Sequence, residues 1–94
     1  MIVTVDDVKT HLRIEDDEEE AYIESLIAQA EAVIEDYCRV QFTDPVPEPV
    51  RLAALLFVSY YYENRDNPDR TAYGTMRMAF QNLLYPYRDV DKLF

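Results

Sequence analysis

The sequence is poor in the residues that build several common kinds of functional site. Its 94 residues include one glycine, one cysteine, one histidine and no tryptophan. A single cysteine cannot form an intrachain disulfide, which excludes a disulfide-stapled secreted scaffold. Cys38 and His11 are too few to make a Cys/His zinc site within one chain. The single glycine also argues against glycine-rich phosphate loops and the frequent tight turns of an all-β fold.

Basic residues are also scarce, and the acidic excess lies in one half of the chain. There are 9 Lys and Arg against 19 Asp and Glu, which gives a net charge of −10. Residues 1–50 carry a charge of −11, whereas residues 51–94 carry +1. Such a chain should repel nucleic acid, and it lacks the basic patch that would hold it on an anionic membrane.

The longest apolar stretch, Leu52–Tyr62, is interrupted only by Ser59. It falls short of the roughly 20 residues that a membrane-spanning helix needs. We also expect no targeting segment, because acids follow the N-terminus before any apolar run of signal-peptide length. The default location is therefore the cytoplasm of the cell that makes the protein.

Apolar residues recur at helical spacing and nowhere alternate with a period of two, which predicts an all-α fold. The strongest amphipathic pattern predicts a long second helix over Glu18–Arg39. The next helix, Val50–Arg65, is apolar all round, so we expect it to be central and mostly buried, or covered partly by a partner subunit. Two short helices, Val5–Leu12 and Thr75–Leu84, bring the predicted number to about four. We expect them to form a single small domain that spans residues 1–94.

Capping residues predict where these helices begin. Thr4 and the acid at Asp7 resemble a capping box. We expect Asp16 or Asp17 to cap the long helix, with the following glutamates in its first turn, where the helix dipole favours negative charge. Pro47 or Pro49 suits the first turn of the third helix. The stretch from residue 66 to residue 74 is predicted to be loop.

No residue pattern points to catalysis, and we expect no catalytic, cofactor-binding or metal-binding residues. His11 lacks a nucleophile in a recognisable motif and is best interpreted as a partly exposed helical histidine. Cys38 lies on the apolar stripe of the long helix, which favours a buried small hydrophobe. The acid run lacks the spaced ligands and the central glycine of an EF-hand, so we interpret it as a solvated surface. This acidic surface comprises Glu15, Asp16, Asp17, Glu18, Glu19 and Glu20.

Aromatic and arginine residues supply the candidates for subunit contacts. Three successive tyrosines on a helix point about 100° apart, so they cannot all face one small core. Tyrosine is enriched at protein interfaces, which favours a role in subunit contacts. An equal alternative is that these tyrosines lie at the edge of the core with their hydroxyl groups in water. Arg65 and Arg88 suit bidentate pairing with carboxylates, such as those of a neighbour's acid run. The candidates are Tyr60, Tyr62, Arg65, Tyr85, Tyr87, Arg88 and Phe94.

Three segments together carry a resemblance to a known family. The first is Val8-Lys9-Thr10-His11-Leu12-Arg13-Ile14, which leads into the acid run. The second is Tyr62-Glu63-Asn64-Arg65, and the third is Leu83-Leu84-Tyr85-Pro86-Tyr87-Arg88. Their order over nearly the whole chain resembles the small head–tail connector (adaptor, head-completion) proteins of long-tailed phages and prophages.

The resemblance implies an all-helical subunit that assembles into a ring below the portal of the filled head. This homo-oligomer would join the portal protein to tail-completion proteins and line part of the DNA channel, with no catalytic residues and no cofactor. It implies a place in the virion, at the head–tail junction, after a stage in the host cytoplasm. DNA would be met only in passage, because a negative surface lets it slide without sticking, although ordinary solubility also explains the charge.

One alternative function stays open on the residues alone. The acid-rich first half would also suit a small binding module that mimics DNA or sequesters a basic host protein. An enzyme ranks last, because only His11 and scattered carboxylates support it.

Overall fold

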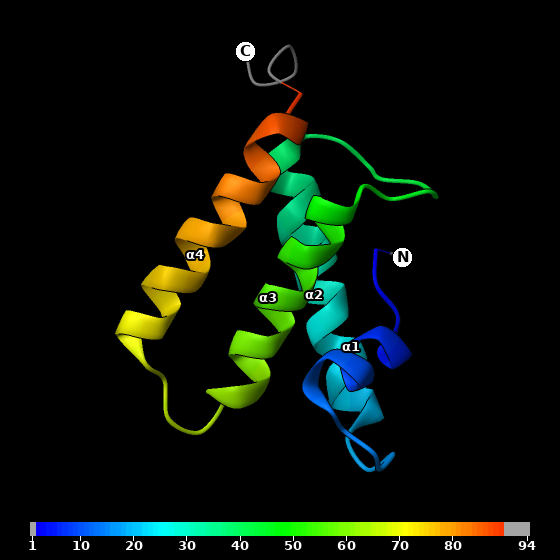
Figure 1. Cartoon of the computed structure of the whole chain (residues 1–94), viewed down its shortest axis with the longest axis vertical. Coiled ribbons are helices and arrows are strands. Elements are labelled where there is room, and N and C mark those ends of the chain that lie inside the picture. The colour runs from blue at the N-terminus through cyan, green and yellow to red at the C-terminus, as the bar shows by residue number, and fades with distance from the viewer. Residues whose placement is uncertain (1, 90–94) are drawn as a thin grey trace.

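The computed structural model describes residues 2–89, which fold into four α-helices and one short 3₁₀ helix (Figure 1). No strand occurs in that part of the chain, so the prediction of an all-α fold is confirmed. None of these helices combines the length and the apolar character that crossing a membrane requires. The elements are α1 (Val5–Leu12), α2 (Glu20–Cys38), α3 (Glu48–Glu63), α4 (Arg70–Leu84) and η1 (Tyr85–Tyr87).

The first helix forms as its capping box predicts. The backbone N–H of Asp7 donates to the Thr4 hydroxyl at 3.0 Å, and the Thr4 N–H donates to the Asp7 carboxylate at 2.9 Å. These bonds satisfy two backbone donors at the helix start. The Thr4 backbone bond is also the main reason that the pKa of Asp7 lies below its ordinary value. Arg51 of α3 reaches the same carboxylate at 3.0 Å and thereby ties α1 to α3.

The start of α2 differs from the prediction. The helix begins at Glu20, and neither Asp16 nor Asp17 caps it, because both side chains are engaged elsewhere. Asp16 accepts from the N–H of Glu18 at 3.1 Å in the preceding turn, and Asp17 pairs with Lys9 of α1. Most of the acid run therefore forms the loop between α1 and α2 and lies outside the helix.

The boundaries of α3 and α4 also move. Pro49 lies in the first turn of α3, as predicted, but the helix begins at Glu48 and ends before Arg65. The predicted loop up to Gly74 is wrong, because α4 already begins at Arg70. The Asp69 carboxylate caps it by accepting from the N–H groups of Thr71 and Ala72 at 2.9 and 3.1 Å. This cap and the residues that follow outweigh the cost of a glycine within the helix.

The third helix is central, as predicted, and packs against α1, α2 and α4. In Figure 1, α4 forms the left edge and α1 lies on the opposite side, with α2 behind α3. The core includes Cys38, which is fully buried as expected, and reaches Leu84 at the end of α4. Not every side of α3 is covered, because Leu52 keeps 43% of its surface exposed. The buried side chains of α3 are Val50, Ala53, Ala54, Phe57 and Val58.

Two helices end at a left-handed residue, the backbone conformation that most favours glycine. With one glycine in the chain, arginines take these places: Arg13 has a φ of 59° and Arg39 a φ of 60°. The backbone N–H of Arg39 donates to the carbonyl of Glu35, which helps to close the end of α2. The single glycine, Gly74, instead lies inside α4.

Two leucines test the position of the core. Leu84 is fully buried, so Leu84→Ala should lower the free energy of unfolding by about 2–5 kcal/mol. Leu52→Ala removes the same atoms from a half-exposed site on α3 and should cost less than about 1 kcal/mol. Urea denaturation of the monomer measures both. Equal losses for the two variants would contradict this packing.

Candidate assembly surfaces

The acid run is anchored by two basic residues of the same chain. Lys9 on α1 pairs with Asp17 and, at 3.4 Å, with Glu20. Arg65, just after α3, donates two hydrogen bonds to the carboxylate of Glu19, at 2.7 and 3.0 Å. The remaining members are exposed and pair with no basic residue among residues 2–89: Glu15, Asp16 and Glu18. The acidic surface predicted from the sequence is thus a fixed loop, with three of its six carboxylates in intrachain ion pairs.

Arg65 lies between two tyrosine rings. Its guanidinium carbon is 5.0 Å from the ring centroid of Tyr22 and 5.3 Å from that of Tyr62. Hydrogen bonds from Arg65 and Tyr62 lower the pKa of Glu19, whereas the carboxylate raises the pKa of Tyr62. A planar guanidinium can contact aromatic rings and donate two hydrogen bonds to one carboxylate at the same time, which the ammonium group of lysine cannot do. The contact that we expected Arg65 to make with a neighbour is thus made to an acid of its own chain.

The three successive tyrosines of α3 are all partly buried. Tyr60 donates its hydroxyl hydrogen to the carbonyl of Asp69 at 3.2 Å, which joins α3 to the cap of α4. Tyr61 packs on Phe57, with ring centroids 4.7 Å apart, and Tyr62 packs on Tyr22 at 6.2 Å. Each ring therefore has an intrachain role, and contacts of Tyr60 and Tyr62 with another subunit stay a prediction.

The C-terminal candidates differ in exposure. Arg88 stacks over the ring of Tyr37 at 4.5 Å and donates its Nε hydrogen to the Tyr37 carbonyl at 3.1 Å. Tyr87 is half-buried against the core, whereas Tyr85 keeps 68% of its surface exposed. Phe94 lies outside the described residues. Tyr85 is therefore the candidate whose side chain is most available to a partner.

Sequence reasoning missed a second exposed apolar side chain on α4. Met78 is 68% exposed, as Tyr85 is, and lies seven residues before it on the same helix face. The sequence could have indicated the exposure of Met78, because this residue falls outside the apolar stripe of Met76, Phe80 and Leu84. Large exposed apolar residues on one face are typical of contact surfaces.

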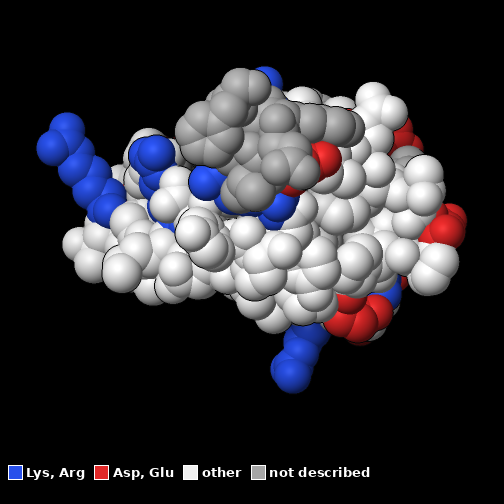
Figure 2. All heavy atoms as spheres, turned by 90° about the horizontal axis from the view of Figure 1, so that it is seen from above, with Lys and Arg blue, Asp and Glu red and all other residues white. Residues whose placement is uncertain are grey.

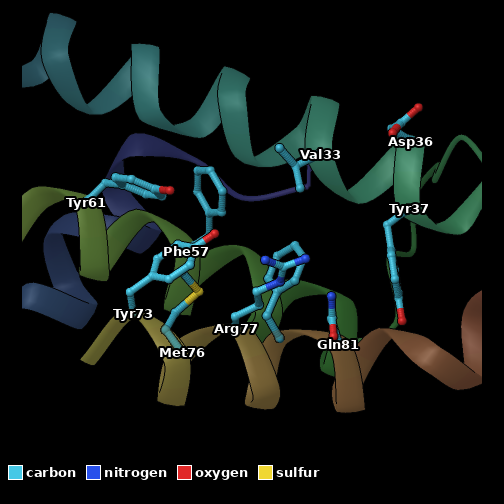
Figure 3. Close-up of a pocket in the computed structure, with 10 residues that line it drawn as sticks. Val33, Asp36, Tyr37, Phe57, Tyr61, Tyr73, Met76, Arg77 and Gln81 are labelled. Atoms are coloured by element: carbon cyan, nitrogen blue, oxygen red, sulfur yellow. The ribbon is translucent and has the colours of Figure 1, made fainter. Parts of the chain in front are cut away.

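A groove of about 290 Å³ lies between α2 and α4, with α3 as its floor. Figure 3 shows Phe57 and Tyr61 in the space between α2 and α4, with Arg77 pointing into that space from α4. Val33 on α2 is 42% exposed and Tyr73 on α4 is 36% exposed at the rim. The sequence could not reveal this groove, because the predicted fourth helix began after Tyr73.

Charge is unevenly distributed between the two sides of the molecule. The residues of α2 include five acids and no base, whereas those of α4 include two arginines and no acid. In the end-on view of Figure 2, basic side chains extend on the left, the side of α4, and most of the visible acidic ones lie on the right. The charge difference between the chain halves thus becomes a difference between α2 and α4.

The features that bear on bond chemistry are clusters of metal-ligating side chains and the two candidate reactive residues, Cys38 and His11. Among residues 2–89, no three His, Cys, Asp or Glu side chains converge in a way that could hold a metal ion. Burial raises the pKa of the Cys38 thiol, which keeps it protonated and weakly nucleophilic at neutral pH. His11 lies exposed on α1. The notable features of the molecule are therefore surfaces.

The Arg65–Glu19 pair gives a pH-dependent prediction. Because the folded state lowers the pKa of Glu19, the pair stabilises the fold at pH 7 and loses this effect as the pH falls through the lowered pKa. Arg65→Gln should lower the melting temperature at pH 7 by about 1–4 °C. The difference from wild type should shrink below about pH 4, where glutamates protonate. Arg13→Gln, which removes an exposed charge with no carboxylate within ion-pair distance in residues 2–89, is the control; a similar pH dependence in both variants would contradict the assignment.

Comparison with known proteins connects these surfaces to a family. The sequence model of the family described as "Phage gp6-like head-tail connector protein" matches residues 2–90, nearly the whole chain. Searches of curated proteins and of solved structures found no match. The match agrees with the resemblance found in the three sequence segments, and it indicates a structural role in phage assembly. The chain belongs to the gp6-like head–tail connector family of phages.

Proposed function

We propose that the protein forms a ring that joins the portal to the tail and lines part of the channel for DNA. The observation that carries this proposal is the family match over residues 2–90. The surfaces described above support it, because they suit contact with other proteins and none suits catalysis. The portal protein and tail-completion proteins are the partners we propose, in the virion after a cytoplasmic stage.

A closed ring needs head-to-tail contacts, in which two different patches of each subunit meet. The chain offers two such patches, the α2–α4 groove and an exposed apolar surface that comprises Met78 of α4 and Tyr85 of η1. Of the other contact candidates, Arg65 and Arg88 are held within their own chain and would act by shaping the surface around them. Tyr60, Tyr62, Tyr87 and Phe94 stay in the proposal as flanking contacts.

We further propose that the acid loop faces the DNA channel. Affinity for DNA comes mainly from Lys and Arg at phosphates, so a carboxylate-lined wall lets the duplex pass without holding it. Anchoring by Lys9 and Arg65 keeps the loop in one place and directs Glu15, Asp16 and Glu18 outward. The carboxylates of the anchored loop also repel the phosphates of the DNA.

Assembly state tests the ring directly. Native mass spectrometry of the protein, alone and with its portal protein, should show one closed oligomer with a fixed number of copies. A monomer at all concentrations, with portal protein present, would contradict the proposal. Capture of a nucleic-acid-binding host protein in place of portal or tail proteins would favour the alternative of an acidic binding module, which the exposed loop also suits.

Charge reversal of the loop tests the channel. Replacing Glu15, Asp16 and Glu18 with Lys should give the assembled protein a measurable affinity for duplex DNA that falls as salt rises. A plot of the logarithm of the binding constant against the logarithm of the salt concentration should steepen by up to about 0.9 for each phosphate contacted. Fluorescence anisotropy with a labelled duplex measures this affinity at salt concentrations between about 50 and 200 mM. Over that interval the affinity of a protein with many phosphate contacts falls by about 10³-fold or more.

A variant with Asp44→Lys, Glu63→Lys and Asp66→Lys, at three exposed positions outside the loop, is the charge-matched control. Equal DNA affinity in the control and the loop variant would contradict a channel-facing loop.

A further inference from the structure

Two arginines of α4 lack the intrachain partners that most other basic residues have. Lys9, Arg39, Arg51 and Arg65 pair with carboxylates. Arg70 and Arg77 have no carboxylate within ion-pair distance among residues 2–89. Arg70 is also the first residue of α4, where the helix dipole disfavours a positive charge. Within residues 2–89, therefore, no ion pair accounts for the charge of either arginine, although Arg77 also lines the groove between α2 and α4.

The single glycine of the chain lies between these arginines. Arg70, Gly74, Arg77 and Gln81 are spaced by four, three and four residues, so they share one face of α4. A methyl group at Gly74 would meet no atom within 4 Å apart from those of its chain neighbours and the surrounding helix backbone. Glycine within a helix costs stability relative to alanine, and nothing inside the chain requires it here. We call these four residues the basic stripe; its glycine would let another backbone approach closely.

A stripe of opposite charge with the same spacing lies on α2. Glu24, Ala28, Glu31 and Glu35 follow each other at four, three and four residues, and we call them the acidic stripe. Glu24, Ala28 and Glu31 border a shallow hollow of about 220 Å³ between α1 and α2, which Val5 and Ile27 also line. Glu24 is exposed. Glu31 accepts from the N–H of Ile2 at 3.1 Å through one carboxylate oxygen, which leaves the other oxygen for a partner.

We infer that the basic stripe of one copy packs on the acidic stripe of the next copy in the ring. Arg70 and Arg77, like Glu24 and Glu31, are seven residues apart, about 10.5 Å along a helix. Each charged pair encloses a small residue, Gly74 or Ala28, so the two helices can approach while both ion pairs form. Figure 1 places α4 at one edge of the molecule and α1, with the adjoining part of α2, toward the other.

The occupant is a second copy, because the chain itself carries both complementary surfaces. They lie on different elements and different sides, which is what a head-to-tail contact requires. A two-fold dimer would use both surfaces only if both could face the same partner at once, which their positions on different sides of the molecule do not allow. The inference rests on the proposed ring and names the surfaces that would form it.

Paired charge reversals test the contact. One variant carries Glu24→Arg and Glu31→Arg, and the other carries Arg70→Glu and Arg77→Glu. Each should assemble at least about tenfold more weakly than wild type, because like charges then face each other. An equimolar mixture should regain assembly with the two variants in a 1:1 ratio, because each then meets an opposite stripe. Native mass spectrometry with portal protein present measures both results.

The matched control carries Asp44→Arg and Glu63→Arg, which change net charge as the first variant does but lie outside both stripes. It should assemble as wild type does. Circular dichroism checks that every variant is folded. Reversal variants that assemble normally while wild type forms a ring would overturn this contact and leave the ring standing. A wild type that never oligomerises would overturn both.

A second measurement locates the contact without changing charge. Ala28→Cys and Gly74→Cys, each in a Cys38→Ala background, should form a mixed disulfide dimer on oxidation when the two proteins are combined. Either protein alone should give several-fold less crosslinked product. Gly74→Ala should raise the melting temperature of the monomer while weakening assembly. Efficient self-crosslinking of each single variant, or unchanged assembly of Gly74→Ala, would contradict the inference.

Discussion

The burial of α3 is the constraint on which the rest of the structure depends. This helix is apolar on nearly all sides, and a chain of 94 residues can cover it only by placing every other helix around it. Therefore α2 lies behind α3, with α4 at one edge and α1 toward the other (Figure 1). Because most of the acids belong to the first half of the sequence, this packing also divides the charge between elements. The acids of α2 and the arginines of α4 thus lie on different helices of one small molecule.

Local signals in the sequence predict much of this fold. The capping box at Thr4, the apolar stripe of α2 and Pro49 at the start of α3 each depend on residues a few positions apart, and each forms as predicted. The failures come from contacts between distant segments. Asp17 does not cap α2 because it pairs with Lys9, and Arg65 is held by Glu19, 46 residues away. No spacing rule indicates which acid a distant arginine will reach.

The net charge of −10 has a more specific interpretation once it is placed on the structure. Some carboxylates hold the α1–α2 loop in position, and others form the acidic stripe on α2. In our account the exposed loop acids face passing DNA, while the stripe acids bind the next subunit. The negative charge is then divided between two surfaces with different roles, and the exposed α4 supplies the complementary positive charge. Met78 of α4 and Tyr85 of the following η1 add exposed apolar surface.

The most direct test of the account is the structure of the wild-type assembly by electron cryomicroscopy. The account predicts a closed ring in which α4 of each subunit lies on α2 of the next and the α1–α2 loops face the central channel. A two-fold dimer, or a ring whose acid loops lie on the outer surface, would contradict it.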